Sequence, residues 1–136
     1  MTTATTTTAA APANFAAAGL LITLEALTDA QLDDLDFGVI GFDSDGIVRR
    51  YNVFESQAAG LSPQRVLGHA LFTVVAPCMN NFLVAQRFED AVGASQTLDE
   101  TVGYVLTLRM RPIKVKLRLL AAPDATARYV LVQRAI

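Results

Sequence analysis

The sequence predicts one α+β domain, in which an antiparallel sheet of five strands is flanked by helices. Two strand patterns meet at Asp45-Gly46, helical patterns occupy the middle of the chain, and three more strand patterns close it. The chain has 136 residues with 52% hydrophobic content, which is enough for one buried core. We therefore expect a single core domain over residues 37–136.

The residues before this core divide into two parts. Residues 1–14 are a low-complexity Thr/Ala tail, for which we expect disorder. Residues 15–36 form an N-terminal cap, because their apolar side chains are too many to be left in water and should dock on the core. Within the cap, Thr28 and Gln31 have the spacing of a capping box, which predicts a short helix to about Leu35.

The core begins with a predicted hairpin. Residues 37–43 and 47–51 are its two strands, and Asp45-Gly46 is a strong signal for the turn between them. Residues 52–59 then predict a short helix that ends at Gly60.

The middle of the chain predicts further helical structure. Ser62-Pro63 combines an N-cap residue with proline at the first helical position. Residues 71–78 are expected to be a connection that Pro77 stiffens. The longest helix is predicted over residues 82–94, and its buried face is expected to consist of Phe82, Ala85, Phe88 and Val92.

The chain ends in three strand patterns, which cover residues 100–110, 113–119 and 129–132. The apolar face of the first is expected to hold Val102, Tyr104, Leu106, Leu108 and Met110. In the second, apolar residues alternate with lysine and arginine, which is typical of a strand with one buried face.

The composition excludes several classes of protein. The single cysteine, Cys78, excludes an intramolecular disulfide and a cysteine zinc site, and it fits a reducing compartment. His69 is the only histidine, so we expect no metal. No run of 18 apolar residues predicts a transmembrane helix, and no base precedes Arg49 to begin a signal peptide. We therefore expect a cytoplasmic protein that does not bind membranes.

The net charge of −2 hides an asymmetry along the chain. Residues 1–48 hold seven acids and no base, whereas residues 49–136 hold eleven bases and six acids, so the two parts carry −7 and +5. Opposite charges suggest that the two parts touch, although two separately solvated faces would give the same pattern. The overall negative charge and the lack of a known nucleic-acid-binding motif argue against nucleic-acid binding.

One pattern is more specific than the rest. Tyr51 and Glu55 are four residues apart, which places both side chains on one face of a helical turn, and Cys78 follows downstream after Val75-Ala76-Pro77. From about residue 29 to 134 the chain resembles the photoactive yellow protein family of PAS-fold blue-light receptors. Further stretches that carry the resemblance are Gln31-Leu32-Asp33, Phe37-Gly38, Asn52, Gly60, Pro63, Gly68, Met110, Pro112 and Lys114-Val115-Lys116.

The resemblance implies a cofactor and roles for individual residues. That family carries p-coumaric acid (4-hydroxycinnamic acid) as a thioester, which would be attached to Cys78 here. Tyr51 and Glu55 would hydrogen-bond the phenolate oxygen of this chromophore, and the backbone N–H of Cys78 would bond its carbonyl. Met110 matches a methionine that helps the chromophore to revert in the dark.

Physical chemistry supports these roles. A buried phenolate needs strong donors, and Glu55 can donate only if it is protonated, which burial and a neighbouring anion both favour. Photoisomerisation from trans to cis would draw the proton from Glu55 and leave a buried carboxylate. The resulting strain is expected to unfold the cap partially as a signal. We expect the acidic cap to lie across a basic sheet face made of Arg109, Arg111, Lys114, Lys116 and Arg118.

Three expected chromophore-binding positions depart from the usual pattern of that family. Ala59 stands where a threonine usually bonds the pocket tyrosine, Leu61 replaces a lid arginine, and Leu108 replaces a tyrosine. Without the threonine hydroxyl, the bond from Tyr51 should weaken, so absorption should lie to the red of a threonine-containing relative. The change at Leu61 removes a candidate counter-charge.

Two alternatives to a photoreceptor remain open. A PAS-like module without a chromophore would only bind a protein partner. A cysteine hydrolase would pair Cys78 with His69, but no residue near His69 in the sequence could orient it as a base, so we expect no enzyme. For a receptor we expect a downstream signalling protein as partner and a monomer or weak homodimer.

Overall fold

Five antiparallel strands form one sheet in the order β2-β1-β5-β4-β3. The computed structural model describes residues 14–107 and 112–134. The strands are β1 (Gly38–Phe42), β2 (Val48–Tyr51), β3 (Leu98–Leu106), β4 (Ile113–Ala121) and β5 (Arg128–Arg134). The last strand lies between the two hairpins and joins them, so the predicted α+β class with a five-stranded antiparallel sheet is confirmed.

The first hairpin turns where the sequence predicts. Gly46 has a φ of 80°, a conformation that glycine adopts without steric cost. The carboxylate of Asp43 accepts from the backbone N–H groups of Asp45 and Ile47 at 2.9 and 3.1 Å, and from Arg49 at 2.8 Å. These bonds close the turn within a few residues, which is why the sequence alone reveals it.

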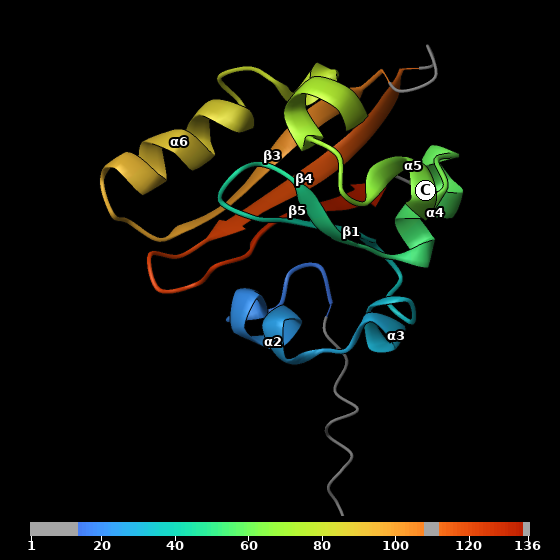
Figure 1. Cartoon of the computed structure of the whole chain (residues 1–136), viewed down its shortest axis with the longest axis horizontal. Helices are drawn as coiled ribbons and strands as arrows, with labels where there is room; N and C mark the ends of the chain where they lie inside the picture. Colours follow the sequence, from blue (N-terminus) through green and yellow to red (C-terminus); the bar gives the residue numbers. More distant parts are fainter. Residues whose placement is uncertain (1–13, 108–111, 135–136) are drawn as a thin grey trace, which may run out of the picture.

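Five helical segments cover one face of the sheet (Figure 1). They are α4 (Val53–Ala59), α5 (Pro63–Val66), the π-helical turn η2 (Leu71–Val75), the 3-10 turn η3 (Pro77–Met79) and α6 (Ala85–Gly93). Residues 71–78, expected to be a plain connection, therefore form two helical turns. A backbone bond of 2.7 Å from Ala76 to Leu71 closes the first turn.

The longest helix starts later than predicted. Phe82 precedes α6 and is 84% exposed, and Val92 is 50% exposed, so neither belongs to the buried face. That face consists of Ala85, Phe88 and Ala91. The reason is local, because the side chain of Asn81 accepts the N–H of Leu83 at 3.0 Å and holds a turn there.

The N-terminal segment packs on the opposite face of the sheet, below it in Figure 1. It contains α2 (Leu20–Ala26) and α3 (Asp29–Leu32), and α3 begins with the predicted capping box between Thr28 and Gln31 but ends before Leu35. A second apolar cluster forms between this segment and the sheet. Its buried members are Phe15, Leu20, Leu24, Leu32, Phe37, Val39, Leu120, Tyr129 and Leu131.

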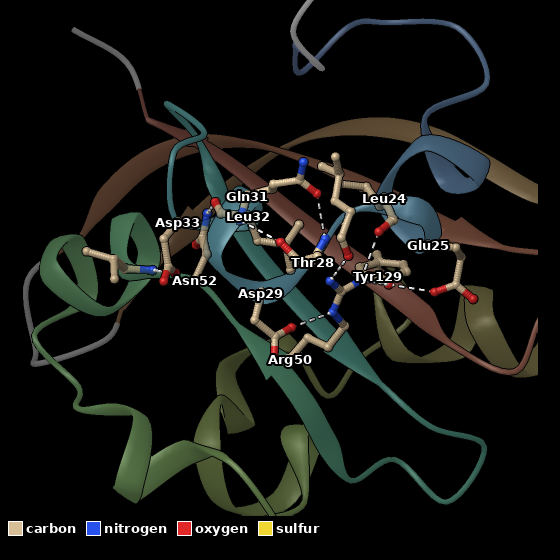
Figure 2. Close-up of polar contacts among 12 residues, drawn as sticks. Leu24, Glu25, Thr28, Asp29, Gln31, Leu32, Asp33, Arg50, Asn52 and Tyr129 are labelled. Carbon is tan, nitrogen blue, oxygen red and sulfur yellow. Dashed lines mark hydrogen bonds and ion pairs between the residues drawn. The ribbon is translucent and has the colours of Figure 1, made fainter. Parts of the chain in front are cut away.

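Two arginines of the sheet fasten this segment through its backbone. Arg118 donates to the carbonyl oxygens of Phe15 and Ala17 at 2.9 and 2.7 Å. Arg50 donates to those of Leu24 and Leu27 at 2.8 and 2.5 Å (Figure 2). The cap is thus attached at both ends of α2.

The basic residues expected to meet the cap have different fates. Arg118 does so, whereas Lys114 and Lys116 are exposed and form no described bond with it. Arg109 and Arg111 lie outside the described residues. Arg50, which was not predicted to contact the cap, makes the remaining attachment.

Across residues 14–107 and 112–134, every helix falls short of the length and apolarity needed to cross a bilayer.

Candidate functional site

Asn52 fixes the start of α4 and so the position of Glu55. Its side-chain oxygen accepts the N–H groups of Glu55 and Val39 at 3.1 and 3.0 Å. Its side-chain nitrogen donates to the carbonyl of Leu32 at 2.9 Å (Figure 2). The same nitrogen donates to the carbonyl of Phe37 at 3.0 Å. Asn52 is 1% exposed, and its side-chain amide makes all four of the hydrogen bonds that it can form. These bonds connect α4, β1 and the cap.

The carboxyl group of Glu55 lies deep in the protein against β1. Glu55 is 1% exposed, and a Cβ atom added at Gly38 would stand 1.9 Å from its Oε1. Only glycine leaves room for the carboxyl at that point. Burial raises the pKa of Glu55, and the nearby Arg134 guanidinium works in the opposite direction.

Arg134 makes a two-pronged ion pair with Glu55. Its Nη1 and Nη2 donate to Oε1 and Oε2 at 2.8 and 3.0 Å. Sequence reasoning missed this residue, although a signal was present. Alternation along β5 places Arg134 on the same face as Val130 and Val132, which belong to the core under the helices.

Tyr51 ends β2 and lies close enough to Glu55 to be affected by its charge. Its hydroxyl donates to the carbonyl oxygen of Leu61 at 3.3 Å, and that oxygen also accepts from Ser56 at 2.8 Å. Burial, together with the negative charge of Glu55, raises the pKa of Tyr51. Tyr51 is thus a neutral hydrogen-bond donor over the whole physiological range.

Two other predicted positions lie on the same stretch of chain. Ala59 ends α4 and is 5% exposed, while Leu61 is partly buried and packs with Tyr51 against the core under the helices. The predicted contacts Leu108 and Met110 lie outside the described residues.

Cys78 sits in the 3-10 turn η3, half-buried and with a free thiol. It packs against the same core as Tyr51 and Leu61. Its carbonyl oxygen accepts from the hydroxyl of Tyr104 and, at 3.2 Å, from the side-chain amide of Asn81. Sequence reasoning assigned neither of these two residues to the site, because both act through a backbone atom.

An open groove of about 1230 Å³ lies beside this site. Asn81 and Tyr104, which hold the backbone of Cys78, line one part of it, and Arg134, which holds Glu55, lines another. The thiol, the buried carboxyl and a neutral tyrosine are the groups that a thioester-linked phenolic pigment needs. The residues present therefore fit such a group.

The fold is that of a PAS domain. No model of a known protein family matches the chain. The PAS domain of an HTR-like protein from Haloarcula marismortui superposes with a TM-score of 0.59 at 19% identity, over 86% of this chain and all of that one. That likeness concerns the fold alone.

The sequence relatives are more specific. The photoactive yellow protein of Rhodothalassium salexigens is 37% identical over 106 residues, which cover 78% of this chain and 84% of that protein. The photoactive yellow protein domain of the sensor histidine kinase Ppr from Rhodospirillum centenum has a TM-score of 0.75 at 35% identity, over 82% of this chain and 97% of that domain. The chain belongs to the photoactive yellow protein family, as its resemblance predicts.

Proposed function

We propose that this member of the family is a blue-light receptor that carries p-coumaric acid as a thioester on Cys78. The observation that carries the proposal is Glu55, a carboxyl that is 1% exposed and whose pKa is raised by burial, next to the neutral donor Tyr51. A carboxyl kept neutral by its surroundings can donate a hydrogen bond at neutral pH.

Each residue of the site has a distinct task in this proposal. When bound, the p-coumaroyl group supplies visible-light absorption and a double bond that isomerises from trans to cis. Tyr51 and protonated Glu55 donate hydrogen bonds to its phenolate end, while Asn81 and Tyr104 hold the Cys78 backbone. The carbonyl of Leu61 accepts the hydroxyl of Tyr51, and by family resemblance Ala59, Leu108 and Met110 belong to the same pocket.

We propose that the signal is the loss of the Glu55 proton followed by partial unfolding of the cap over residues 15–36. Proton loss exchanges the donor role of Glu55 for the ion pair with Arg134, and so rearranges the buried contacts of α4. Because a domain is typically stabilised by only about 5–15 kcal/mol, a change in one buried hydrogen-bond network is a large part of its stability. Asn52 links the two regions, because it bonds the N–H of Glu55 and the carbonyl of Leu32 in the cap. Strain at α4 therefore reaches the cap through one side chain.

The recipient of this signal is proposed to be a downstream signalling protein. The similar domain from Rhodospirillum centenum is part of a sensor histidine kinase. A cap that leaves the sheet would expose the apolar cluster beneath it, which is a suitable surface for a protein partner.

The test is to supply activated p-coumaric acid during expression, with Cys78→Ser as the matched control. We expect a yellow protein that bleaches in blue light and recovers in the dark. Its intact mass should carry the thioester, and mild base should remove the added mass. Colourless protein with an unmodified Cys78 would overturn the proposal in favour of a PAS-like interaction module.

A further inference from the structure

The ion pair between Glu55 and Arg134 specifies a protonation state. Both carboxylate oxygens accept from the guanidinium, at 2.8 and 3.0 Å. A fork of this kind requires two acceptor oxygens and therefore an ionised carboxylate. A neutral Glu55 that donates its O–H elsewhere has to give up at least one of these bonds. The two arrangements exclude each other.

Among the residues that the structure describes, Arg134 is the cation that pairs with this carboxyl. Tyr51 at the end of β2 is a second titratable neighbour, since the charge of Glu55 helps to raise the pKa of Tyr51, and it is neutral. Farther along the adjoining groove stand Asp36 before β1, and Lys114 and Lys116 on β4. None of these three forms a described ion pair with Glu55.

Arg134 is itself partly committed to this role. Its side chain is 15% exposed, and its Nε is buried without a partner among the described residues. An arginine that hydrogen-bonds only through its fork gains little from its position unless that fork holds an anion.

We propose that Arg134 is the internal counter-ion of Glu55, which receives the carboxylate whenever Glu55 loses its proton. The site then alternates between a neutral Glu55 that donates a hydrogen bond and an anionic Glu55 held by Arg134. Leu61 stands where the family usually has an arginine, and it carries no charge. The cation that stabilises anionic Glu55 is therefore Arg134 at the end of β5. Arg134 is a positioning residue, and it stabilises one of two forms of the same acid.

The counter-ion role can be tested on protein prepared without pigment, by unfolding in denaturant between pH 5 and 9. Arg134→Gln should lose stability relative to wild type by an amount that grows as pH rises, because Glu55 ionises in that direction and then lacks its partner. In the Glu55→Gln background the same substitution should cost an equal amount at every pH. A purely structural role for Arg134 predicts a pH-independent loss in both backgrounds.

Two further variants sharpen this test. Arg134→Lys keeps the charge without the fork and should recover part of the pH-dependent loss. Arg128→Gln, at the other end of β5 and without a described ion pair, should show no pH-dependent loss. If Arg134→Gln and Arg128→Gln gave the same pH profile, the counter-ion role would be wrong.

The consequence for the light response rests on the proposed function. In pigment-loaded protein, Arg134→Gln should speed dark recovery at least tenfold, because it destabilises anionic Glu55 and one pKa unit corresponds to a tenfold change in protonation. Recovery within twofold of wild type would overturn the role of Arg134 in the light response. A colourless protein that still shows the pH-dependent loss would instead refute the proposed photoreceptor and leave the counter-ion intact.

Discussion

The site and the cap both depend on arginines that are buried or partly buried, but these arginines bind different kinds of group. At the site, Nη1 and Nη2 of Arg134 donate to the carboxylate of Glu55, a group that titrates. At the cap, Arg118 and Arg50 donate to backbone carbonyls, which do not titrate. Protonation of Glu55 can therefore change the first arrangement directly. The backbone bonds of the second are lost only when the cap itself moves, and the exposed ion pair of Arg50 with Asp29 adds little to them.

This difference assigns the two regions different parts in a switch. The site can hold two forms of one acid within an otherwise fixed fold. The cap is held by several bonds from arginines to its backbone carbonyls that form or break together, so it behaves as one unit of local stability. Asn52 is the link between them, because one amide bonds to both regions.

The largest effect should come from the cap attachment. Arg118→Ala removes two bonds to the cap carbonyls and the pair with Asp99, and charge-assisted bonds of this kind are worth about 1.5–3 kcal/mol each. We expect a loss of about 3 kcal/mol in the free energy of unfolding and faster hydrogen exchange over residues 15–27. Lys116→Ala, at an exposed position two residues before Arg118 on the same strand, is the control and should change neither. Unchanged exchange in Arg118→Ala would show that the apolar cluster alone holds the cap.

The site should respond next, through the space at Gly38. The methyl group of Gly38→Ala would lie 1.9 Å from Oε1 of Glu55, so the carboxyl must move away from Arg134. Overpacking of this size typically costs about 1–3 kcal/mol, and we expect a loss of that size in the free energy of unfolding. Chemical denaturation would measure it. Gly103→Ala is the matched control, since its added methyl meets no atom within 4 Å. Equal stabilities of the two variants would show that the carboxyl is not confined as described.

A smaller effect concerns the pH dependence of stability. Burial raises the pKa of Glu55 in the folded protein, so the native state binds this proton more tightly than the unfolded state does. The contribution of Glu55 to the free energy of unfolding is therefore fully present below 4.5, the ordinary pKa of a glutamate. This contribution is lost as the pH rises through the higher pKa of the folded state. We expect Glu55→Gln to remove this loss, which amounts to about 1.4 kcal/mol per unit of pKa elevation. Denaturation at a series of pH values measures it, and parallel curves for both proteins would contradict the prediction.

The smallest effect should be optical. Ala59→Thr places a hydroxyl at the buried end of α4, where the family resemblance puts a partner of Tyr51, and should shift the absorption of pigment-loaded protein to the blue. Hydrogen exchange in the cap should stay the same, so this variant would separate an effect on the site from an effect on the cap. Ala58→Thr, at an exposed position on the same helix, is the control. A red shift or none in Ala59→Thr would show that a hydroxyl at this position does not strengthen Tyr51 as a donor.

The sequence predicted the elements whose signals are local. The capping box of Thr28 and Gln31, the turn at Gly46 and the end of α4 at Gly60 all depend on bonds between residues a few positions apart. The prediction failed at the start of α6, where Phe82 has the right spacing for a buried face. There a side-chain bond from Asn81 competes with the helix, and periodicity does not record such bonds.

The candidate site divides in the same way. Tyr51, Glu55 and Cys78 stand out in the sequence because the resemblance fixes their spacing. Asn81 and Tyr104 are missing from the prediction, since they hold the carbonyl of Cys78 rather than its thiol. Backbone contacts made by side chains leave little trace in a pattern of residue types.

By itself, the sequence determined the class of the fold, the family and the short segment that carries Tyr51 and Glu55, because these rest on local chemistry and on motif spacing. The tertiary structure alone decided which cation meets the buried acid and which arginines fasten the cap. Glu55 and Arg134 are 79 residues apart, and Arg118 and Phe15 are 103 apart. Such pairs form only when strand order and register bring them together, and no short-range rule specifies that outcome.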